Sequence, residues 1–512
     1  MKNTPNFYFK RIRLLIGLDL INLRQQKIFC KIMSIQQVLT PKQKALIINL
    51  NPKIYGSFAE IGAGQETVRF FYRAGAASGT LAKAMSAYDK DFSDAIYGAE
   101  SDNRYVTQKR LKKMLDHEMV LMMERLNKEH HQEKCFFAYA NTVTTIDYSK
   151  KNEGHGWVGI RFKLNVEDKE ADEIVVHVKF KENSAKLQQE TLGILGVNLI
   201  YGAYYLYENP RELIKSLYDS LDKDQLEIDM INFRGPHFKY VDNRLMSLQL
   251  VKNGFTDVAI FNPEGKNILP ADLLYKKNIY AVRGSFRPVM NVNMDMFQGG
   301  LSQFRQTEGV TDNNTEILFE ITLSNLIASG LQGELDERDF LDRADIIGSL
   351  GFNVIISNFS EYYKLVDYFS KFTRNQTKIG LAMGVNNLLE IFKENYYTNL
   401  PGGIMEAFGK LFKKQMKIFL YPYLDKKDNL LLNSKNLKVE KNLHELYKFF
   451  LYNDKIEDIT EYNEDYLNTY SRDILRKISN NESGWEKECP KSVVELIKER
   501  GMFGYNEHLL LE

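Results

Sequence analysis

The pattern of hydrophobic and polar positions changes its period twice along the chain. Apolar side chains recur at helical spacing between Thr107 and Asn127, which predicts one long amphipathic helix capped by Thr107. The pattern then becomes β-rich, with short charged or glycine-containing links between runs at 136–148, 156–166 and 173–180. Consecutive strands with short turns predict an antiparallel meander.

The segment before this helix mixes helix and strand patterns. A helical pattern covers residues 34–51, and a short strand is expected at 55–61. This strand leads into a Gly62-Ala63-Gly64 turn and a helical run at 65–74. Residues 76–97 are rich in Ala, Gly and Ser, so we expect close-packed helix and loop there rather than a second strand.

Strand and helix patterns alternate from residue 186 to residue 425, in about seven or eight units. Parallel strands need crossover helices, so this alternation predicts a parallel sheet. The number of units fits a closed barrel as well as an open doubly wound sheet, and we slightly favour the barrel.

These patterns predict an α/β protein with an N-terminal α+β domain and a C-terminal parallel domain. The chain has 512 residues and 44% hydrophobic content, enough for more than one large core. We expect the α+β domain at 33–185, the parallel α/β domain at 186–425 and a helical C-terminal extension at 426–512.

Residues 1–32 differ from the rest of the chain. They hold seven basic residues and one acid, Asp19, which interrupts the only apolar run. A secretory signal needs an unbroken apolar run and a cleavage site, and neither is present. We expect a misassigned extension before a functional start at Met33, with a short basic amphipathic arm as the alternative.

Composition and charge narrow the classes of partner. Lys plus Arg is 68 and Asp plus Glu is 67, so no excess of positive charge indicates binding to nucleic acid. No stretch is long and apolar enough for a membrane helix, so we expect a cytoplasmic protein whose partner is a small molecule. The histidine and cysteine spacings predict no metal site, and they indicate no particular cofactor or oligomeric state.

One candidate site is the segment from Glu60 through Gly62 to Gly64. A strand, an acidic residue, a Gly-x-Gly turn and a helix start resemble the first motif of S-adenosylmethionine-dependent methyltransferases, which would make these three residues cofactor-binding. Glycines let a ligand approach the backbone, and a helix N-terminus favours anions. Glu66 stands where that motif has a third glycine, however, so a tight structural turn is the alternative.

A second candidate site uses position in the fold. Predicted strands end near 232, 261 and 282, and the residues after them are polar or cationic: Arg234 and Arg244, Asn262, and Arg283 and Arg287. Ligands bind at the carboxyl ends of parallel strands, and arginine suits phosphate or carboxylate, so we expect an anion-binding rim. The alternative is that each arginine caps a helix or pairs with an acid.

The same rim holds the candidates for catalysis. His237 has an ordinary pKa near neutrality and lies in the loop after the first of these strands, so it is the expected general acid or base. Asp242, a few residues later, is the second catalytic candidate.

Several strings resemble a bacterial family, found in Bacteroidetes and cyanobacteria, that is slightly shorter than this chain. They include FAEIGAGQETVRFF, MSAYDKDFSDAIYG, RYVTQKRLKKMLDHE, LYKKNIYAVRGSFRPV, IISNFSEYYKLVDYFS, MGVNNLLEIF and IKERGMFGY. Its members often carry the label nicotinate-nucleotide (or nicotinamide mononucleotide) adenylyltransferase, and some the label TonB-dependent receptor. The resemblance runs from Met33 to Tyr505.

The adenylyltransferase label implies nucleotidyl transfer in NAD biosynthesis, with Mg²⁺ as the implied ion. The HxGH motif of the usual α/β nucleotidyltransferases is missing, so no catalytic residue carries over from them. The receptor label conflicts with the helices between the predicted strands.

The working hypothesis is a cytoplasmic enzyme that acts on a small anionic, nucleotide-like substrate, with nucleotidyl transfer as the candidate that the resemblance implies. Two alternatives stay open: an S-adenosylmethionine-dependent methyltransferase that uses the Gly62 turn, and a non-catalytic binding or scaffold protein.

Overall fold

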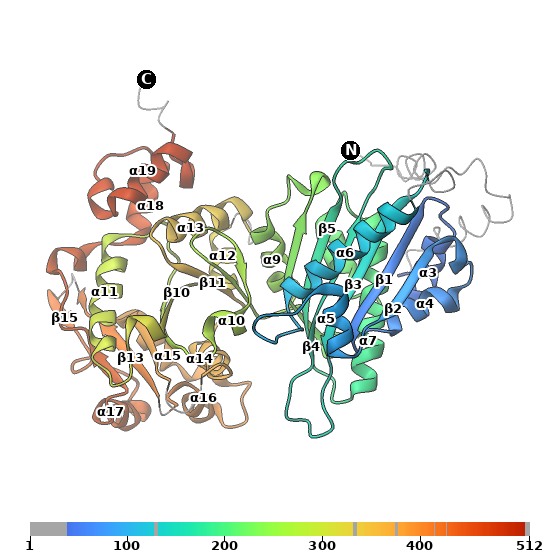
Figure 1. Ribbon diagram of the computed structural model, residues 1–512. Helices are drawn as coiled ribbons and strands as arrows, with labels where there is room; N and C mark the ends of the chain where they lie inside the picture. The colour runs from blue at the N-terminus through green and yellow to red at the C-terminus, as the bar shows by residue number, and fades with distance from the viewer. Residues whose placement is uncertain are drawn as a thin grey trace. The chain divides into compact units, whose positions relative to one another are not determined.

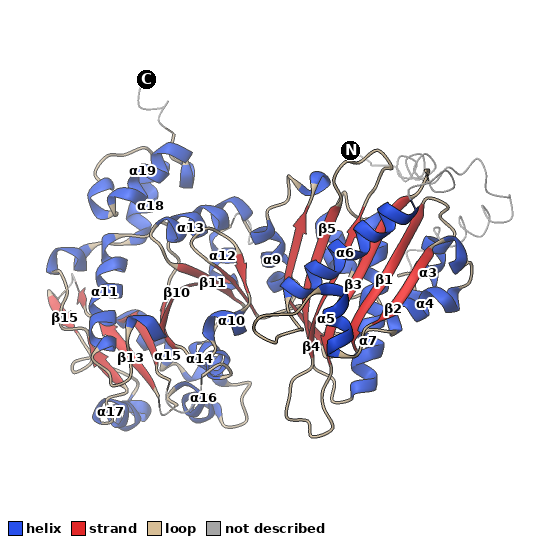
Figure 2. Ribbon diagram, in the orientation of Figure 1, coloured by secondary structure: helices blue, strands red, loops and turns tan. Residues whose placement is uncertain are grey.

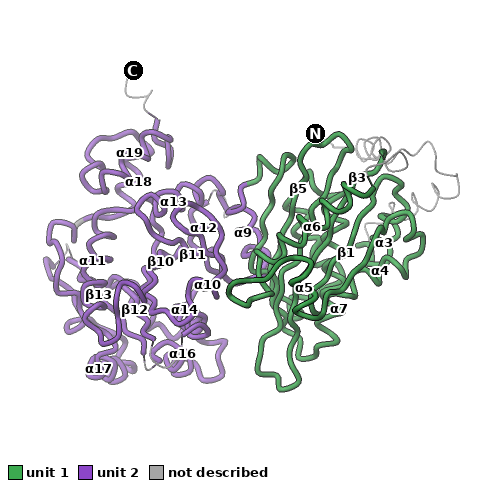
Figure 3. The backbone as a smooth tube through the Cα atoms, viewed as in Figure 1, with its two compact units in different colours: residues 1–241 green, residues 242–512 purple. Residues whose placement is uncertain are grey.

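A computed structural model describes residues 38–126, 132–330, 335–373, 377–413, 415–425 and 428–506. The chain forms two compact units, residues 1–241 and 242–512 (Figure 3). The observed boundary differs from the one expected at residue 185, because the strand at 226–234 pairs with the last strand of the meander. The expected extension at 1–32 lies outside the described residues.

Unit 1 is built on a mixed six-stranded sheet in the order β2-β1-β3-β4-β5-β6 (Figure 1). Its strands are β1 (Ile54–Gly62), β2 (Leu81–Ser86), β3 (Cys135–Thr144), β4 (His155–Phe162), β5 (Asp172–Phe180) and β6 (Leu226–Arg234). β1 is parallel to both β2 and β3, whereas β3 to β6 are antiparallel neighbours. The predicted meander is confirmed, and β6 extends it.

Strand β2 lies where the sequence predicted helix and loop. Most of its side chains are partly or fully exposed, as expected at a sheet edge. An edge strand with exposed faces does not need the apolar, β-branched composition of a buried strand. This is why composition alone missed it.

Helices cover both faces of the unit 1 sheet (Figure 2). They are α3 (Pro41–Asn49), α4 (Glu66–Ala74), α5 (Lys90–Tyr97), α6 (Gln108–Leu126), α7 (Ala185–Tyr205) and α8 (Pro210–Ser216). α3, α4 and α7 pack together, and Phe58 of β1 contacts Phe71 of α4. α6 packs on β1, β3 and β4 and buries the predicted apolar stripe, with Thr107 accepting from the backbone N–H of Arg110.

The first described helix begins at Pro41 with a capping box between Thr40 and Gln43. The helical pattern expected at 34–51 is confirmed over Pro41–Asn49, and its start at 34–37 lies outside the described residues. The helix α7 is buried over most of its second half, at residues 195–200, 202 and 203.

Unit 2 is built on a mostly parallel eight-stranded sheet in the order β16-β13-β12-β9-β10-β11-β7-β8. Its strands are β7 (Val258–Phe261), β8 (Asn267–Ile268), β9 (Asn278–Arg283), β10 (Thr315–Thr322), β11 (Asn353–Ser357), β12 (Ile379–Gly384), β13 (Met416–Tyr421) and β16 (Ile456–Asp458). β8 and β16 end the order and are not paired with each other, so the sheet is open. The parallel α/β prediction is confirmed in its doubly wound form, and the leaning to a barrel is wrong.

Two hydrophobic cores lie on the two faces of this sheet. One is closed by α9 (Asn243–Lys252), α11 (Asn291–Arg305), α12 (Leu323–Ser329), α13 (Glu337–Ser349), α18 (Ser471–Ser479) and α19 (Lys491–Arg500). The other is closed by α10 (Pro270–Leu274), α14 (Tyr362–Ser370), α15 (Val385–Ile391), α16 (Gly403–Leu411) and α17 (His444–Tyr452). A small hairpin of β14 (Tyr423–Asp425) and β15 (Leu430–Leu432) follows β13.

Candidate functional site at the carboxyl ends of β1 and β3

The carboxyl end of β1 is a topological switch point. From β1 the chain runs through α4 to β2 on one side, and it then returns through α5 and α6 to β3 on the other side. In open α/β sheets, ligands bind outside the carboxyl ends of strands at such a point. This position is therefore the first place in unit 1 to look for a site.

Polar side chains from three strands lie side by side there. Glu60 on β1 is paired in register with Ser86 on β2 and with Asn141 on β3. Side chains alternate along a strand, so Glu60 lies on the same face as Phe58, which packs on α4. The three polar residues thus share the face that α4 and α7 cover.

The Gly62 turn is held tightly against β3. Gly62 has φ +81°, and an added Cβ would lie 2.1 Å from the carbonyl oxygen of Val143. A Cβ at Gly64 would lie 1.8 Å from Oδ1 of Asn141. The space that both glycines leave open is therefore filled by β3, and their expected contact with a cofactor stays a prediction.

Gln65 fixes the far side of the turn. Its Nε2 donates to the carbonyl oxygen of Gly62 and to Oγ of Ser86, both at 2.6 Å. Because Ser86 Oγ accepts this bond, its own proton remains available to another acceptor. Ser86 is exposed, so that proton is within reach of a ligand.

Two buried acceptors face this site without a partner. Glu60 is 2% exposed and Asn141 is fully buried, and neither Glu60 Oε1 nor Asn141 Oδ1 accepts a hydrogen bond within the described chain. Burial raises the pKa of Glu60 to about 7, and the nearby charge of Glu66 adds to this. Both effects disfavour the ionised carboxylate.

A carboxyl group with a pKa near 7 can donate or accept a proton at neutral pH. Buried polar atoms usually have a hydrogen-bond partner in folded proteins, so an acceptor without one has room for a donor from a ligand or from water. Glu60 was predicted from the sequence as part of this site, but Asn141 and Ser86 were not. The available signal for Asn141 is a buried-strand pattern in which an amide residue follows the apolar run at 135–140.

The predicted arginine rim does not form at one sheet edge. Arg234 ends β6 in unit 1 and is exposed, whereas Arg283 ends β9 in unit 2 and Arg287 follows that strand. The prediction placed these strands in a single parallel sheet. The strands belong to two different sheets, because β6 joins the meander of unit 1.

The predicted anion-binding arginines Arg283 and Arg287 of unit 2 form ion pairs with carboxylates. Arg283 is buried and donates twice to Glu320, at 2.7 and 2.8 Å, and once to the carbonyl oxygen of Ser360. Arg287 donates to Asp339 at 2.6 Å. Each arginine is thus held by an acid in this structure, and its role in binding an anion stays a prediction.

The two catalytic candidates have separate environments. His237 donates to Asp172 at the start of β5, from its backbone N–H at 3.0 Å and from ring Nδ1 at 2.7 Å. Asp172 is fully buried, and burial raises its pKa. Asp242 caps α9 and forms an ion pair with Arg244. The structure therefore gives His237 an orienting carboxylate, and proton transfer by His237 or Asp242 stays a prediction.

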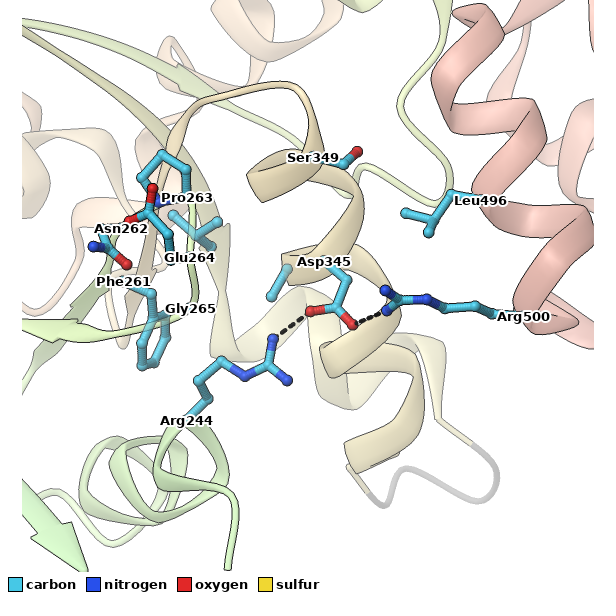
Figure 4. Close-up of a pocket in the computed structure, with 12 residues that line it drawn as sticks. Arg244, Phe261, Asn262, Pro263, Glu264, Gly265, Asp345, Ser349, Leu496 and Arg500 are labelled. Atoms are coloured by element: carbon cyan, nitrogen blue, oxygen red, sulfur yellow. Dashed lines mark hydrogen bonds and ion pairs between the residues drawn. The ribbon is translucent and has the colours of Figure 1, made fainter.

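Two of the predicted anion-binding residues, Arg244 and Asn262, do come together. They line a pocket of about 230 Å³ within unit 2, along with the β7–β8 turn and parts of α13 and α19 (Figure 4). Asp345 of α13 accepts from Arg244 and, at 2.8 Å, from Arg500 of α19. In the described ranges, no group of three or more His, Cys, Asp or Glu side chains is arranged to hold a metal ion.

Solved structures of the CinA superfamily are similar to part of this chain. The competence-damaged protein (CinA) superfamily protein from Enterobacter cloacae is 10% identical, with a TM-score of 0.25, over 33% of this chain and 95% of that chain. The competence/damage inducible protein CihA from Agrobacterium tumefaciens is 15% identical, with a TM-score of 0.19, over 28% of this chain and 83% of that chain. A CinA superfamily protein from Escherichia coli is 10% identical, with a TM-score of 0.22, over 31% of this chain and 90% of that chain. Scores this low carry no argument about activity.

The family resemblance expected from the sequence is wrong. No protein-family model matches the chain, and no curated protein matches it. The structural matches are to the CinA superfamily, over about a third of the chain, and none of the three bears the adenylyltransferase or receptor label. Among the described residues, no helix combines the length and apolar character needed to cross a membrane.

Proposed function

We propose that unit 1 is a small-molecule enzyme module in which Glu60 transfers a proton at the carboxyl ends of β1 and β3. The observation that carries this proposal is the buried, unpartnered Oε1 of Glu60 together with a pKa of about 7. A perturbed carboxyl group at a strand end is a recurrent mark of catalytic sites.

The chemistry of the site favours a substrate that donates hydrogen bonds. Glu60 Oε1 and Asn141 Oδ1 are both acceptors, and they come from residues paired across β1 and β3. An amino or amide N–H group would satisfy both and remove the cost of burying them unpaired. The available hydroxyl of Ser86 would then donate to an acceptor on the same substrate.

The site does not favour an anion as the group next to Glu60. The charge of Glu66 already raises the pKa of Glu60, and no basic group contributes to that pKa. An anionic group beside these carboxyls would be repelled. An anionic part of the substrate would therefore have to lie away from Glu60.

A metabolite extract provides the test, because the substrate is not specified. The full chain is incubated with the extract, and mass spectrometry follows which compounds are consumed. We expect wild type, and the control variant Glu124→Gln, which changes an exposed carboxylate on α6, to consume at least one compound bearing an amine or amide. Glu60→Gln, which keeps the shape of the side chain, should lose this activity. Consumption that persists in Glu60→Gln, or no consumption by wild type, would overturn the proposal.

A further inference from the structure

The pocket of unit 2 has two walls that carry opposite charges. Glu264 lies on the β7–β8 turn, and Arg500 lies near the end of α19 (Figure 4). Both side chains are exposed, which leaves them accessible from solvent. The lining also includes the buried apolar side chains Phe261 and Val354, each 1% exposed.

The charged groups of the pocket are not equally available. Arg244 is compensated twice, since it donates to Asp242 at 2.8 Å and also to Asp345. Arg500 donates to Asp345 only through Nη1, and its side chain is 52% exposed. The two arginines of the pocket form ion pairs with Asp242 and Asp345, and neither pairs with Glu264. Glu264 and the remaining donors of the half-exposed Arg500 are therefore the charged groups that a ligand can reach.

We propose that this pocket binds a small zwitterion, with its carboxylate on Arg500, its ammonium on Glu264 and an apolar segment over Phe261 and Val354. Charge-assisted hydrogen bonds to guanidinium and carboxylate groups are the strong ones in proteins. A simple anion fits less well, because the lining holds two carboxylates, Asp345 and Glu264, against two arginines.

The size of the pocket limits the ligand to a small metabolite. Sites for drug-sized ligands have volumes of about 300 to 1,000 Å³, and this one holds about 230 Å³. An amino acid whose amino and carboxylate groups are separated by methylene groups has the required charges and apolar segment. The proposal does not depend on Glu60, which lies in unit 1.

The test measures binding of a chain-length series to the full protein by calorimetry. The probes are glycine, β-alanine, γ-aminobutyrate and ε-aminocaproate, with butyrate and butylamine as half-ligands that carry one charge each. We expect at least one zwitterion to bind at least about tenfold more tightly than either half-ligand. Glu264→Gln and Arg500→Gln should each remove most of this advantage.

Matched controls are available on the same two elements. Lys266→Gln on the turn and Glu499→Gln on α19 change exposed charges that do not line the pocket, and they should leave affinity unchanged. Circular dichroism checks that each variant is folded. The proposal is overturned if no zwitterion binds, if butyrate binds as tightly as the zwitterions, or if affinity survives both Glu264→Gln and Arg500→Gln.

Discussion

Replacement of Glu60 by Gln should change how the stability of the protein depends on pH. The pKa of Glu60 is about 7 in the folded chain against an ordinary value of 4.5, so the folded state binds more protons than the unfolded state between these values. Stability from this group is fully present below pH 4.5 and is lost as the pH rises to 7. At 1.36 kcal/mol for each pKa unit, the loss in wild type amounts to about 3 kcal/mol. Glu60→Gln carries no such titration.

Urea unfolding at a series of pH values from 4 to 9 measures this effect. We expect the free energy of unfolding of Glu60→Gln, relative to wild type, to increase by about 3 kcal/mol between the two ends of the series. Glu66→Gln is the control: it keeps Glu60, and it lowers the pKa of Glu60 by removing a neighbouring charge, so the loss should be smaller but present. If wild type and Glu60→Gln give parallel curves, Glu60 is not protonated in the folded chain, and the reasoning about the site is refuted.

Three further predictions concern other residues. Burial and the charges of His177 and Lys179 lower the pKa of His155 to about 4 from 6.5, so this group destabilises the protein as the pH falls from 6.5 to 4. In urea unfolding, His155→Gln should remove about 3 kcal/mol of that loss of stability. If the free energy of unfolding changes equally with pH in wild type and in His155→Gln, this prediction is wrong. Gly64→Ala should destabilise unit 1 by about 1 to 3 kcal/mol, because the added Cβ would overlap the side chain of Asn141. The control Gly409→Ala lies in α16 with open space around it, so it should be neutral or stabilising by up to about 1 kcal/mol. Glu320→Gln should lower the free energy of unfolding by about 3 to 5 kcal/mol, because it leaves the buried Arg283 without its charge partner. Asp312→Asn, which breaks the exposed pair with Arg305, should lower it by less than about 1 kcal/mol. Similar losses in the two variants would mean that burial of the Arg283 pair has no energetic weight.

Local patterns in the sequence predicted local structure well. The stripe on α6 and the strands of the meander depend on the spacing of apolar residues over one element, and a sequence displays that spacing directly. The sequence did not decide between a barrel and a doubly wound sheet for unit 2, because closure of a sheet depends on which strands are neighbours. The pairing of β9 with both β10 and β12 brings together segments that are far apart in the sequence, and β7 runs antiparallel to β11.

The candidate sites show the same division. Arg283 was correctly placed at the end of a strand, but its partner Glu320 comes from the neighbouring strand, paired with it in register. No pattern near Arg283 indicates that pairing. Glu60 was predicted as part of a strand and cofactor-binding turn, whereas its raised pKa comes from burial and from the charge of Glu66. The burial of a single carboxylate depends on tertiary packing, which the sequence does not display.

The position of α19 in a core of unit 2 has a consequence for biosynthesis. Val493, Ile497 and Tyr505 belong to the same hydrophobic core as Val251 and Phe319. That core cannot close on the ribosome until Tyr505 has left the exit tunnel, whereas the sheet of unit 1 is complete once Arg234 has been made. Domains fold as units during synthesis, starting from the N-terminal end. Unit 2 should therefore depend on chaperones for longer than unit 1, and messages interrupted before codon 505 should yield chains with only unit 1 resistant to protease.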